Sequence, residues 1–117
     1  NIYKMGVLEK MRKKGVGEIT LYTISDCKYC QALKGTLQEL RIPFNNIDVE
    51  QDEAVGDYLE SKLGTEYYPI ICIKKAPEEY TYIISETNLE KLSRIRIFNS
   101  IEEALEILLE YYYEIQV

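Results

Sequence analysis

Apolar side chains recur at helical spacing in two internal segments of the chain. In residues 28–40 they lie three or four positions apart, which places them on one face of a helix, and Pro43 blocks its continuation. Residues 53–63 begin with acidic side chains, which helix N-termini favour, and Gly64 follows as a common helix-terminating residue. Both segments are therefore predicted to be helices.

The two ends of the chain carry the same periodicity. Residues 2–14 predict a helix, so that residues 1–17 would form an N-terminal helical extension. Near the other end, Ser100 and Glu103 form a capping box, which marks the start of a helix. Because its apolar stripe continues to Ile115, we expect a C-terminal helix over that stretch.

Short β-rich or continuously apolar runs separate these helices. The run at 70–74 is apolar almost throughout, which is typical of a central strand buried on both faces. Strands are expected at 19–24, 44–49, 70–74 and 80–85, and a turn between the last two predicts a hairpin. Residues 86–99 form an atypical connection, in which we expect a short helix at 88–94 and a short strand at 95–98.

The predicted order is β-α-β-α-β-β-α behind one additional helix. A βαβ unit implies two parallel strands joined by a right-handed crossover, whereas a hairpin implies an antiparallel pair. The 117 residues are enough for one domain with a core of its own. The pattern thus predicts a single α/β domain, residues 1–117, built on a mixed sheet.

Composition narrows the range of partners and locations. A net charge of −6 argues against nucleic acid, whose phosphates require clustered lysine and arginine. No apolar run is long enough for a membrane span, and the first residues lack the apolar stretch of a signal peptide. The chain begins with Asn1, as a processed form or an expression fragment would. We expect a cytoplasmic location.

The cysteine and histidine content limits the chemistry. Without histidine, the usual Ser-His-Asp and Cys-His arrangements and imidazole metal ligands are excluded. The three cysteines are a poor framework for structural disulfides and too few to close a four-ligand zinc site from this chain alone. We therefore expect no metal site and no tightly bound cofactor.

Two of these cysteines form a C-x-x-C pair between a predicted strand and a predicted helix. Cys27 falls at the helix N-terminus, where free backbone N–H groups and the helix dipole stabilise a thiolate. Cys30 lies one turn later, on the stripe that faces the core. This asymmetry predicts an exposed Cys27 that attacks a substrate disulfide as the nucleophile. Cys30 is then the buried, resolving thiol that releases the reduced product.

Two further residues lie at the third predicted strand. Pro69 directly precedes it, at a position where a proline costs no ladder hydrogen bond. From this spacing alone, an ordinary trans proline that opens a strand would be the simpler interpretation. Cys72 falls inside the apolar run and is expected to be a buried, structural thiol.

Residues 19–73 resemble the glutaredoxin family. The matching features are Ile-Thr-Leu-Tyr-Thr from Ile19, Cys27-x-Tyr29-Cys30, Ile42-Pro43-Phe44, Ile47-Asp48-Val49, and Gly64 followed by Tyr68-Pro69. The resemblance implies a thioredoxin-like fold, with a four-stranded mixed sheet flanked by helices and a cis proline at position 69. It also implies dithiol reduction supported by glutathione or a reductase, with Tyr29 and the backbone of Tyr68 lining the substrate groove. We expect Lys28, Tyr29, Tyr68 and Pro69 to bind the substrate or glutathione.

Several positions depart from the family pattern around the glutathione site. Lys28 stands where proline is common, and Tyr68 stands where valine is usual. The positive residue that often precedes the first cysteine is absent from residues 23–26, and residues 85–88 replace a Gly-Gly-x-Asp turn. We expect Glu86, near the groove, to repel an anionic tripeptide.

The sequence therefore predicts a glutaredoxin-like thiol-disulfide oxidoreductase that reduces protein or small-molecule disulfides. Glutathione is a candidate co-substrate. One alternative is a thioredoxin-like hydrogen donor fed by a flavoprotein reductase. A second is a dimer that bridges an iron–sulfur cluster through Cys27 and external thiols. A third is a binding module that uses the groove at Tyr68-Pro69 and the tyrosines of residues 111–113.

Overall fold

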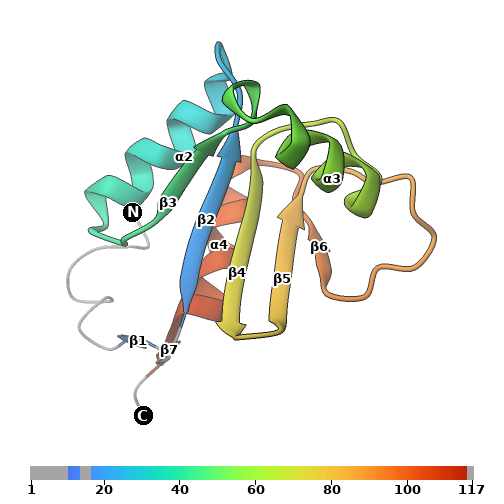
Figure 1. Ribbon diagram of the computed structural model, residues 1–117. Helices are drawn as coiled ribbons and strands as arrows, with labels where there is room; N and C mark the ends of the chain where they lie inside the picture. Colours follow the sequence, from blue (N-terminus) through green and yellow to red (C-terminus); the bar gives the residue numbers. More distant parts are fainter. Residues whose placement is uncertain (1–10, 14–16, 116–117) are drawn as a thin grey trace.

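The computed structural model describes residues 11–13 and 17–115. Its central sheet has five strands in the order β3-β2-β4-β5-β6 (Figure 1). β2 is parallel to β3 and antiparallel to β4, and β5 is antiparallel to β4 and parallel to β6. The strands are β2 (Glu18–Thr23), β3 (Asn45–Asp48), β4 (Ile70–Ala76), β5 (Glu79–Ile84) and β6 (Ile95–Ile97). This is the mixed α/β sheet of a thioredoxin-like fold, in which β6 is added to the four strands that the family resemblance implied.

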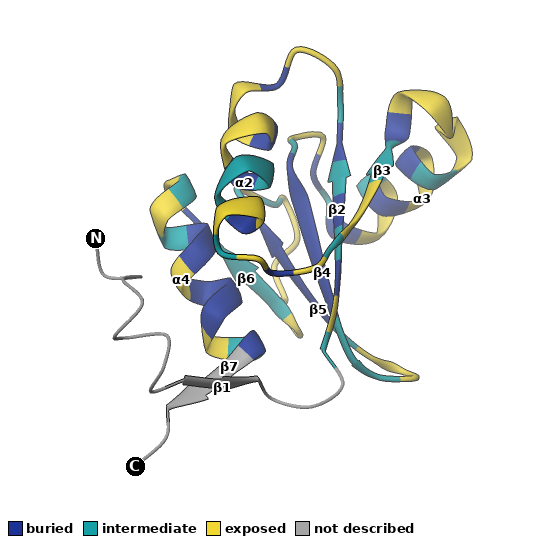
Figure 2. Cartoon of the chain, turned by 90° about the vertical axis from the view of Figure 1, so that its left-hand side faces the viewer, coloured by how far each residue is buried: buried dark blue, intermediate teal, exposed yellow. Residues whose placement is uncertain are grey.

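Helices cover both faces of this sheet (Figures 1 and 2). α2 (Lys28–Glu39) and α4 (Ile101–Tyr112) pack on one face, and α3 (Glu53–Leu63) packs on the other. A short 3₁₀ turn, η1 (Val49–Gln51), links β3 to α3. The helices predicted at 28–40 and 53–63 are confirmed, and the second ends at Gly64, whose φ of 62° is the left-handed conformation that glycine favours.

Strand β4 is buried on both faces, as its apolar run predicts. Ile71 and Ile73 face the core beneath α2 and α4, while Ile70 and Cys72 face the cluster beneath α3. The alternation follows from the two-residue period of a strand. β4 thus joins the two halves of the core, and its N-terminal end lies directly after Pro69.

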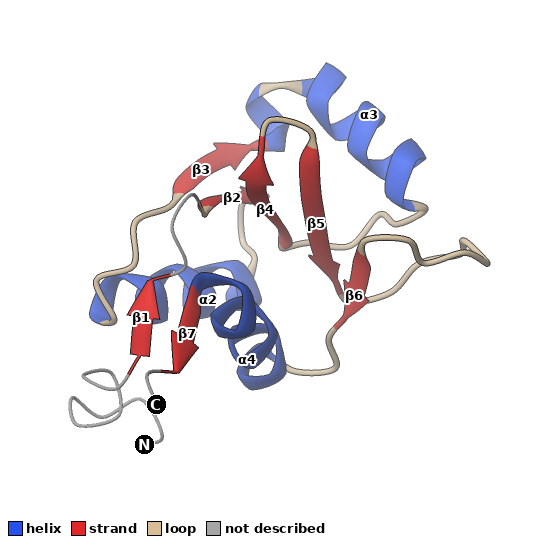
Figure 3. Ribbon diagram, turned by 90° about the horizontal axis from the view of Figure 1, so that it is seen from below, coloured by secondary structure: helices blue, strands red, loops and turns tan. Residues whose placement is uncertain are grey.

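The two ends of the described chain differ from the prediction. Residues 11–13, expected to be helical, form strand β1 (Met11–Lys13), which pairs antiparallel with β7 (Tyr113–Ile115). The rest of the predicted N-terminal helix lies outside the described residues. α4 ends at Tyr112, so the helix predicted to reach Ile115 is too long. Figure 3 shows the two short strands next to α4 and apart from the central sheet. Backbone pairing between distant segments overrides the local helical pattern.

The connection between β5 and α4 also differs in part. The strand expected near 95–98 is present as β6, but residues 88–94 form turns and bends and not a helix. Leu89 and Leu92 are 38% and 45% exposed, so a helix there would have no apolar face to bury. In the part of the chain that the structure describes, no helix has the length and apolarity of a membrane crossing.

Candidate active site

The cysteine pair lies where β2 ends and α2 begins. Cys27 is the N-cap of α2, and the backbone N–H of Cys30 donates a hydrogen bond of 3.1 Å to its Sγ. The two residues are joined by a disulfide, with their Cα atoms 5.2 Å apart. This N–H is one of the donors that a helix leaves unpaired at its first turn, and here it points at sulfur. A thiolate at Cys27 would gain from the same donor and from the helix dipole.

The two cysteines differ less in their solvent exposure than the sequence predicted. Cys30 is fully buried on the α2 stripe with Leu33 and Leu37, as predicted. Cys27 is 9% exposed, whereas the sequence predicted an exposed residue. Cys27 is buried because its Sγ is bonded to Cys30 and lies 3.9 Å from the backbone oxygen of Tyr68. Cys27 remains the more accessible of the two.

The carboxylate of Glu50, in the 3₁₀ turn between β3 and α3, holds the loop before Cys27. Glu50, in η1, accepts hydrogen bonds from both the N–H (2.7 Å) and the hydroxyl of Ser25. These two bonds lower the pKa of the Glu50 carboxyl, the hydroxyl having the larger effect. Asp26 between Ser25 and Cys27 has a φ of 53°, in the left-handed region that aspartate tolerates better than most residues. The position of this loop is thus fixed by Glu50, a residue outside the C-x-x-C motif.

The Tyr68-Pro69 peptide bond is cis, as the resemblance implied. Tyr68 is bound at both ends, since its backbone oxygen contacts the Cys27 sulfur and its phenol donates a 2.8 Å hydrogen bond to Glu60 on α3. Burial first, and then this bond to a carboxylate, raise the pKa of the Tyr68 phenol. The phenol therefore stays protonated and remains a donor near neutral pH.

A cavity of about 270 Å³ opens beside the disulfide. It is lined by three of the predicted binding residues, Tyr29, Tyr68 and Pro69, together with Tyr67, Phe98 and Ile101. Lys28 is exposed and is not among the residues that line this cavity. Sequence reasoning missed Phe98 and Ile101, because it expected the segment after the fourth strand to occupy this position. β6 returns the chain to the same end of the sheet, so that the start of α4 reaches the groove.

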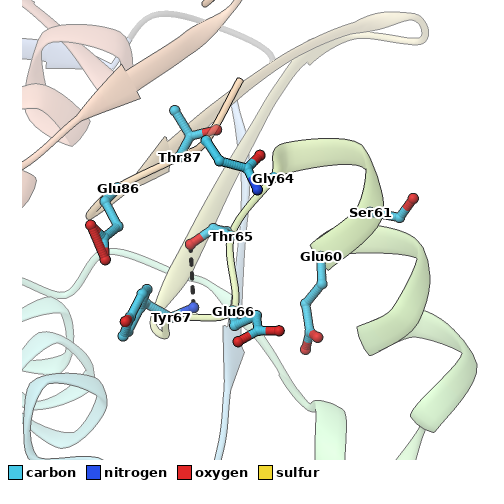
Figure 4. Close-up of a pocket in the computed structure, with 9 residues that line it drawn as sticks. Glu60, Ser61, Gly64, Thr65, Glu66, Tyr67, Glu86 and Thr87 are labelled. Carbon is cyan, nitrogen blue, oxygen red and sulfur yellow. Dashed lines mark hydrogen bonds between the residues drawn. The ribbon is translucent and has the colours of Figure 1, made fainter. Parts of the chain in front are cut away.

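A second cavity, of about 580 Å³, lies next to the first, with which it shares Tyr67 (Figure 4). Its lining includes three carboxylates, from Glu60 on α3, Glu66 before β4 and Glu86 after β5. Tyr67 lines both cavities, and its backbone N–H is held by the hydroxyl of Thr65. Of the described residues, no lysine or arginine lines either cavity.

The third cysteine is separate from this site. Cys72 is a buried free thiol beneath α3, and it lines neither of the two cavities. Burial is the main cause that raises the pKa of the Cys72 thiol to about 11, and a hydrogen bond with Tyr82 opposes the shift. Within the described ranges, no three histidine, cysteine or acidic side chains are grouped as metal ligands would be.

Comparison with known proteins places this geometry in context. The glutaredoxin family model matches residues 19–76. N-acetyl-S-hydroxy-L-cysteine reductase from Bacillus subtilis is 32% identical over 77 residues, which are 66% of this chain and 81% of that protein. A putative glutaredoxin of Mycobacterium tuberculosis is 37% identical over 46 residues, 39% of this chain and 55% of that protein. NrdH-redoxin from Escherichia coli, a glutaredoxin-like protein with a thioredoxin-like activity profile, is 25% identical. Its structure covers 54% of this chain and 78% of its own, with a TM-score of 0.45.

Proposed function

Because the chain belongs to the glutaredoxin family, we propose that it is a thiol-disulfide oxidoreductase that reduces disulfides through Cys27 and Cys30. The observation that carries this proposal is the disulfide itself. It caps α2 and has the backbone oxygen of Tyr68 3.9 Å from the Cys27 sulfur. The domain, residues 1–117, would act in the cytoplasm on protein or small-molecule disulfides.

The two thiols have different tasks in this reaction. In the reduced protein, the Cys27 thiolate attacks one sulfur of the substrate disulfide, and the other substrate sulfur leaves as a thiolate that takes up a proton. Cys30 then loses its proton and attacks the Cys27 sulfur of the mixed disulfide. This step releases the second substrate thiol and leaves the Cys27–Cys30 disulfide. Two electrons pass from the protein to the substrate in each cycle.

The substrate would bind in extended form against Tyr68-Pro69. A substrate backbone could pair with the Tyr68 peptide group, as in β-strand addition, while Tyr29 and Pro69 contact its side chains. Lys28, directly after Cys27, would contact the substrate from the exposed side of the disulfide. Re-reduction requires a thiol such as glutathione or a flavoprotein reductase, which attacks the Cys27–Cys30 disulfide in turn.

Single-cysteine variants test this assignment. Reduced Cys27→Ser is expected to lose all disulfide reduction, whereas Cys30→Ser should stop at the mixed disulfide, which intact-mass spectrometry detects. Cys30→Ser should also keep a partial reaction that depends on glutathione. Equal alkylation rates of the two thiols at neutral pH would contradict the assigned roles. Turnover with glutathione and its reductase, compared with thioredoxin reductase, identifies the reductant.

The Bacillus subtilis relative favours a second candidate activity on an S-hydroxycysteine group, which is a sulfenic acid. A sulfenic acid condenses with a thiol to form a disulfide. The Cys27 thiolate would displace hydroxide, which leaves as water after protonation, and the same mixed disulfide would form. Cys30 resolves it as before. Disappearance of a cysteine sulfenic acid upon addition of the reduced protein, and no change with Cys27→Ser, is the expected result.

A further inference from the structure

The cavity beside the disulfide and the second cavity are neighbours, because Tyr67 lines both. We call their combined surface the docking groove and define it by the lining of both cavities. Any disulfide that reacts with Cys27 must lie against it, since the Cys27 sulfur contacts Tyr68 in its wall. The character of the groove therefore decides which disulfides react.

The part next to the disulfide is aromatic and open to solvent. Tyr29 and Tyr67 are 64% and 57% exposed, although both are large side chains of the kind that usually gain from burial. Pro69, Phe98 and Ile101 complete this part of the lining. An exposed apolar patch beside a reactive group is typical of a contact surface for an apolar side chain of a partner.

The part farther from the disulfide is negative. Glu60, Glu66 and Glu86 line it, and among the residues that the structure describes no lysine or arginine lines either cavity. Asp26 and Glu50 add carboxylates on the loop side of Cys27, where exposed Lys28 is the opposing charge. Carboxylates that line a shared cleft reinforce each other's potential and attract cations.

The N-terminus of α4 does not make the electrostatic potential of the groove positive. A helix N-terminus attracts anions through its free backbone N–H groups, and Ser100 and Ile101 line the groove. Here, however, the helix uses its own side chains as caps. Glu103 accepts a hydrogen bond of 3.0 Å from the Asn99 N–H, and its own N–H donates to Ser100 Oγ at 3.1 Å. The Glu103 carboxylate thus adds a negative charge at this helix start.

We propose that the preferred substrate is a polypeptide disulfide with an apolar residue next to the reactive cysteine and lysine or arginine a few residues away. The inference rests on the proposed function and names the substrate class of that site. The apolar residue fits between Tyr29 and Tyr67, and the basic residue reaches Glu66 and Glu86. An extended chain can occupy both parts at once. Glutathione disulfide, which carries a net negative charge, is disfavoured.

The test uses three synthetic peptide disulfides that differ only in the residues flanking a leucine-cysteine pair, which are lysine, alanine or glutamate. Fully reduced protein is mixed with each peptide, and thiol release is measured in a single turnover, so that no reductase is needed. We expect the lysine peptide to react about tenfold faster than the glutamate peptide at low salt. This ratio should approach one in salt on the order of 1 M, where charges are screened. Glutathione disulfide should react no faster than the glutamate peptide.

Charge-neutral variants locate the effect. Glu66→Gln with Glu86→Gln should bring the lysine and glutamate peptides to within about twofold of each other. The control is Glu39→Gln with Glu79→Gln, two exposed acids at the end of α2 and the start of β5, which removes the same charge from the far end of the fold. It should keep the original ratio. Equal rates for the three peptides with the unaltered protein would overturn the inference and leave the proposed function standing. No thiol release from any disulfide would instead overturn the proposed function.

Discussion

The phenol of Tyr68 donates a hydrogen bond of 2.8 Å to Glu60 Oε2, which ties the residue before the cis proline to helix α3. At the other end of the same residue, the backbone oxygen lies 3.9 Å from the Cys27 sulfur. Gly56, one turn before Glu60, lies next to the phenol, since a Cβ there would be in ordinary contact with the phenol oxygen at 3.8 Å. Helix α3 is thereby connected to the redox disulfide through one side chain.

Tyr68→Phe tests whether this connection positions the site. Removing the hydroxyl should lower the free energy of unfolding by about 1 kcal/mol, because one hydrogen bond to a charged group is lost while the ring still packs. The rate of disulfide reduction should fall as well, since the Tyr68 backbone loses its anchor. Urea denaturation and kcat/KM measure the two effects.

The partner residue supplies the controls for this variant. Glu60→Gln keeps an acceptor oxygen and should preserve most of the stability, whereas Glu60→Ala should resemble Tyr68→Phe. Combining Glu60→Ala with Tyr68→Phe should cost less than the sum of the two single changes, as expected for residues in direct contact. Strict additivity would show that the hydrogen bond contributes nothing.

Gly64 connects α3 to the acidic part of the docking groove, and its replacement should be costly. Its φ is 62°, and a Cβ there would clash with the Asn88 side chain and lie 2.9 Å from Leu89 Cγ. Gly64→Ala should therefore lower the free energy of unfolding by about 1–3 kcal/mol in urea denaturation. Gly35→Ala is the matched control, since no atom lies within 4 Å of a Cβ at that position in α2. It should raise stability by about 0.5–1 kcal/mol, and equal effects of the two changes would contradict this account.

The elements that the sequence predicts well are those with local signals. Helices α2 and α3 match within one residue, because the apolar period, the residues that favour a helix start and a following Pro43 or Gly64 are all encoded in neighbouring positions. The cysteine pair was found for the same reason, because it lies in a short motif directly after a strand that its own composition reveals. The cis bond before Pro69 was implied only by the family resemblance, since local spacing favoured an ordinary trans proline.

The elements that it predicts poorly depend on partners far along the chain. Strands β1 and β7 pair across almost the whole sequence, and each is only three residues long. Both segments are too short to show the alternation over about 4–8 residues by which a strand is recognised. The same limit explains the site, because Phe98 and Ile101 reach the disulfide only through the return of β6 along β5. The groove is formed by residues that are far apart in the sequence, so local spacing does not predict which residues line it.

Cys72 should be inert toward alkylation in the folded protein. The thiol is buried, and its pKa is raised to about 11, so that almost no thiolate exists near neutral pH. After reduction, iodoacetamide at neutral pH should label Cys27 first and leave Cys72 unlabelled until the protein is unfolded in urea. Peptide mapping by mass spectrometry distinguishes the sites. Rapid labelling of Cys72 under native conditions would contradict this prediction.

The same pKa shift makes stability depend on pH in the alkaline range. A thiol whose pKa is higher in the folded protein favours folding below the pKa of the unfolded chain, and this contribution is lost as the pH rises through the folded value. The window runs from the ordinary value of 9.0 to about 11. Wild-type protein should therefore lose stability relative to Cys72→Ala across this window. A difference between the two that does not change with pH would show that Cys72 does not titrate differently in the folded state.

Glu50 should titrate below the ordinary range, because Ser25 donates to it from both its N–H and its hydroxyl. A carboxyl whose pKa is lowered by folding stabilises the folded loop above its unfolded pKa, and the contribution is lost as the pH falls through the folded value. Carbon-13 NMR should show the lowered pKa of Glu50, and the Ser25 amide proton should follow the same titration. Ser25→Ala removes the hydroxyl hydrogen bond and should raise the pKa of Glu50 most of the way back to its ordinary value. The hydrogen bond from the backbone N–H of residue 25 should keep a smaller part of the shift. Ser93→Ala, at an exposed serine outside this loop, should leave the Glu50 titration unchanged. If the Ser25 amide proton does not respond to the titration of Glu50, this carboxylate does not hold the loop before Cys27.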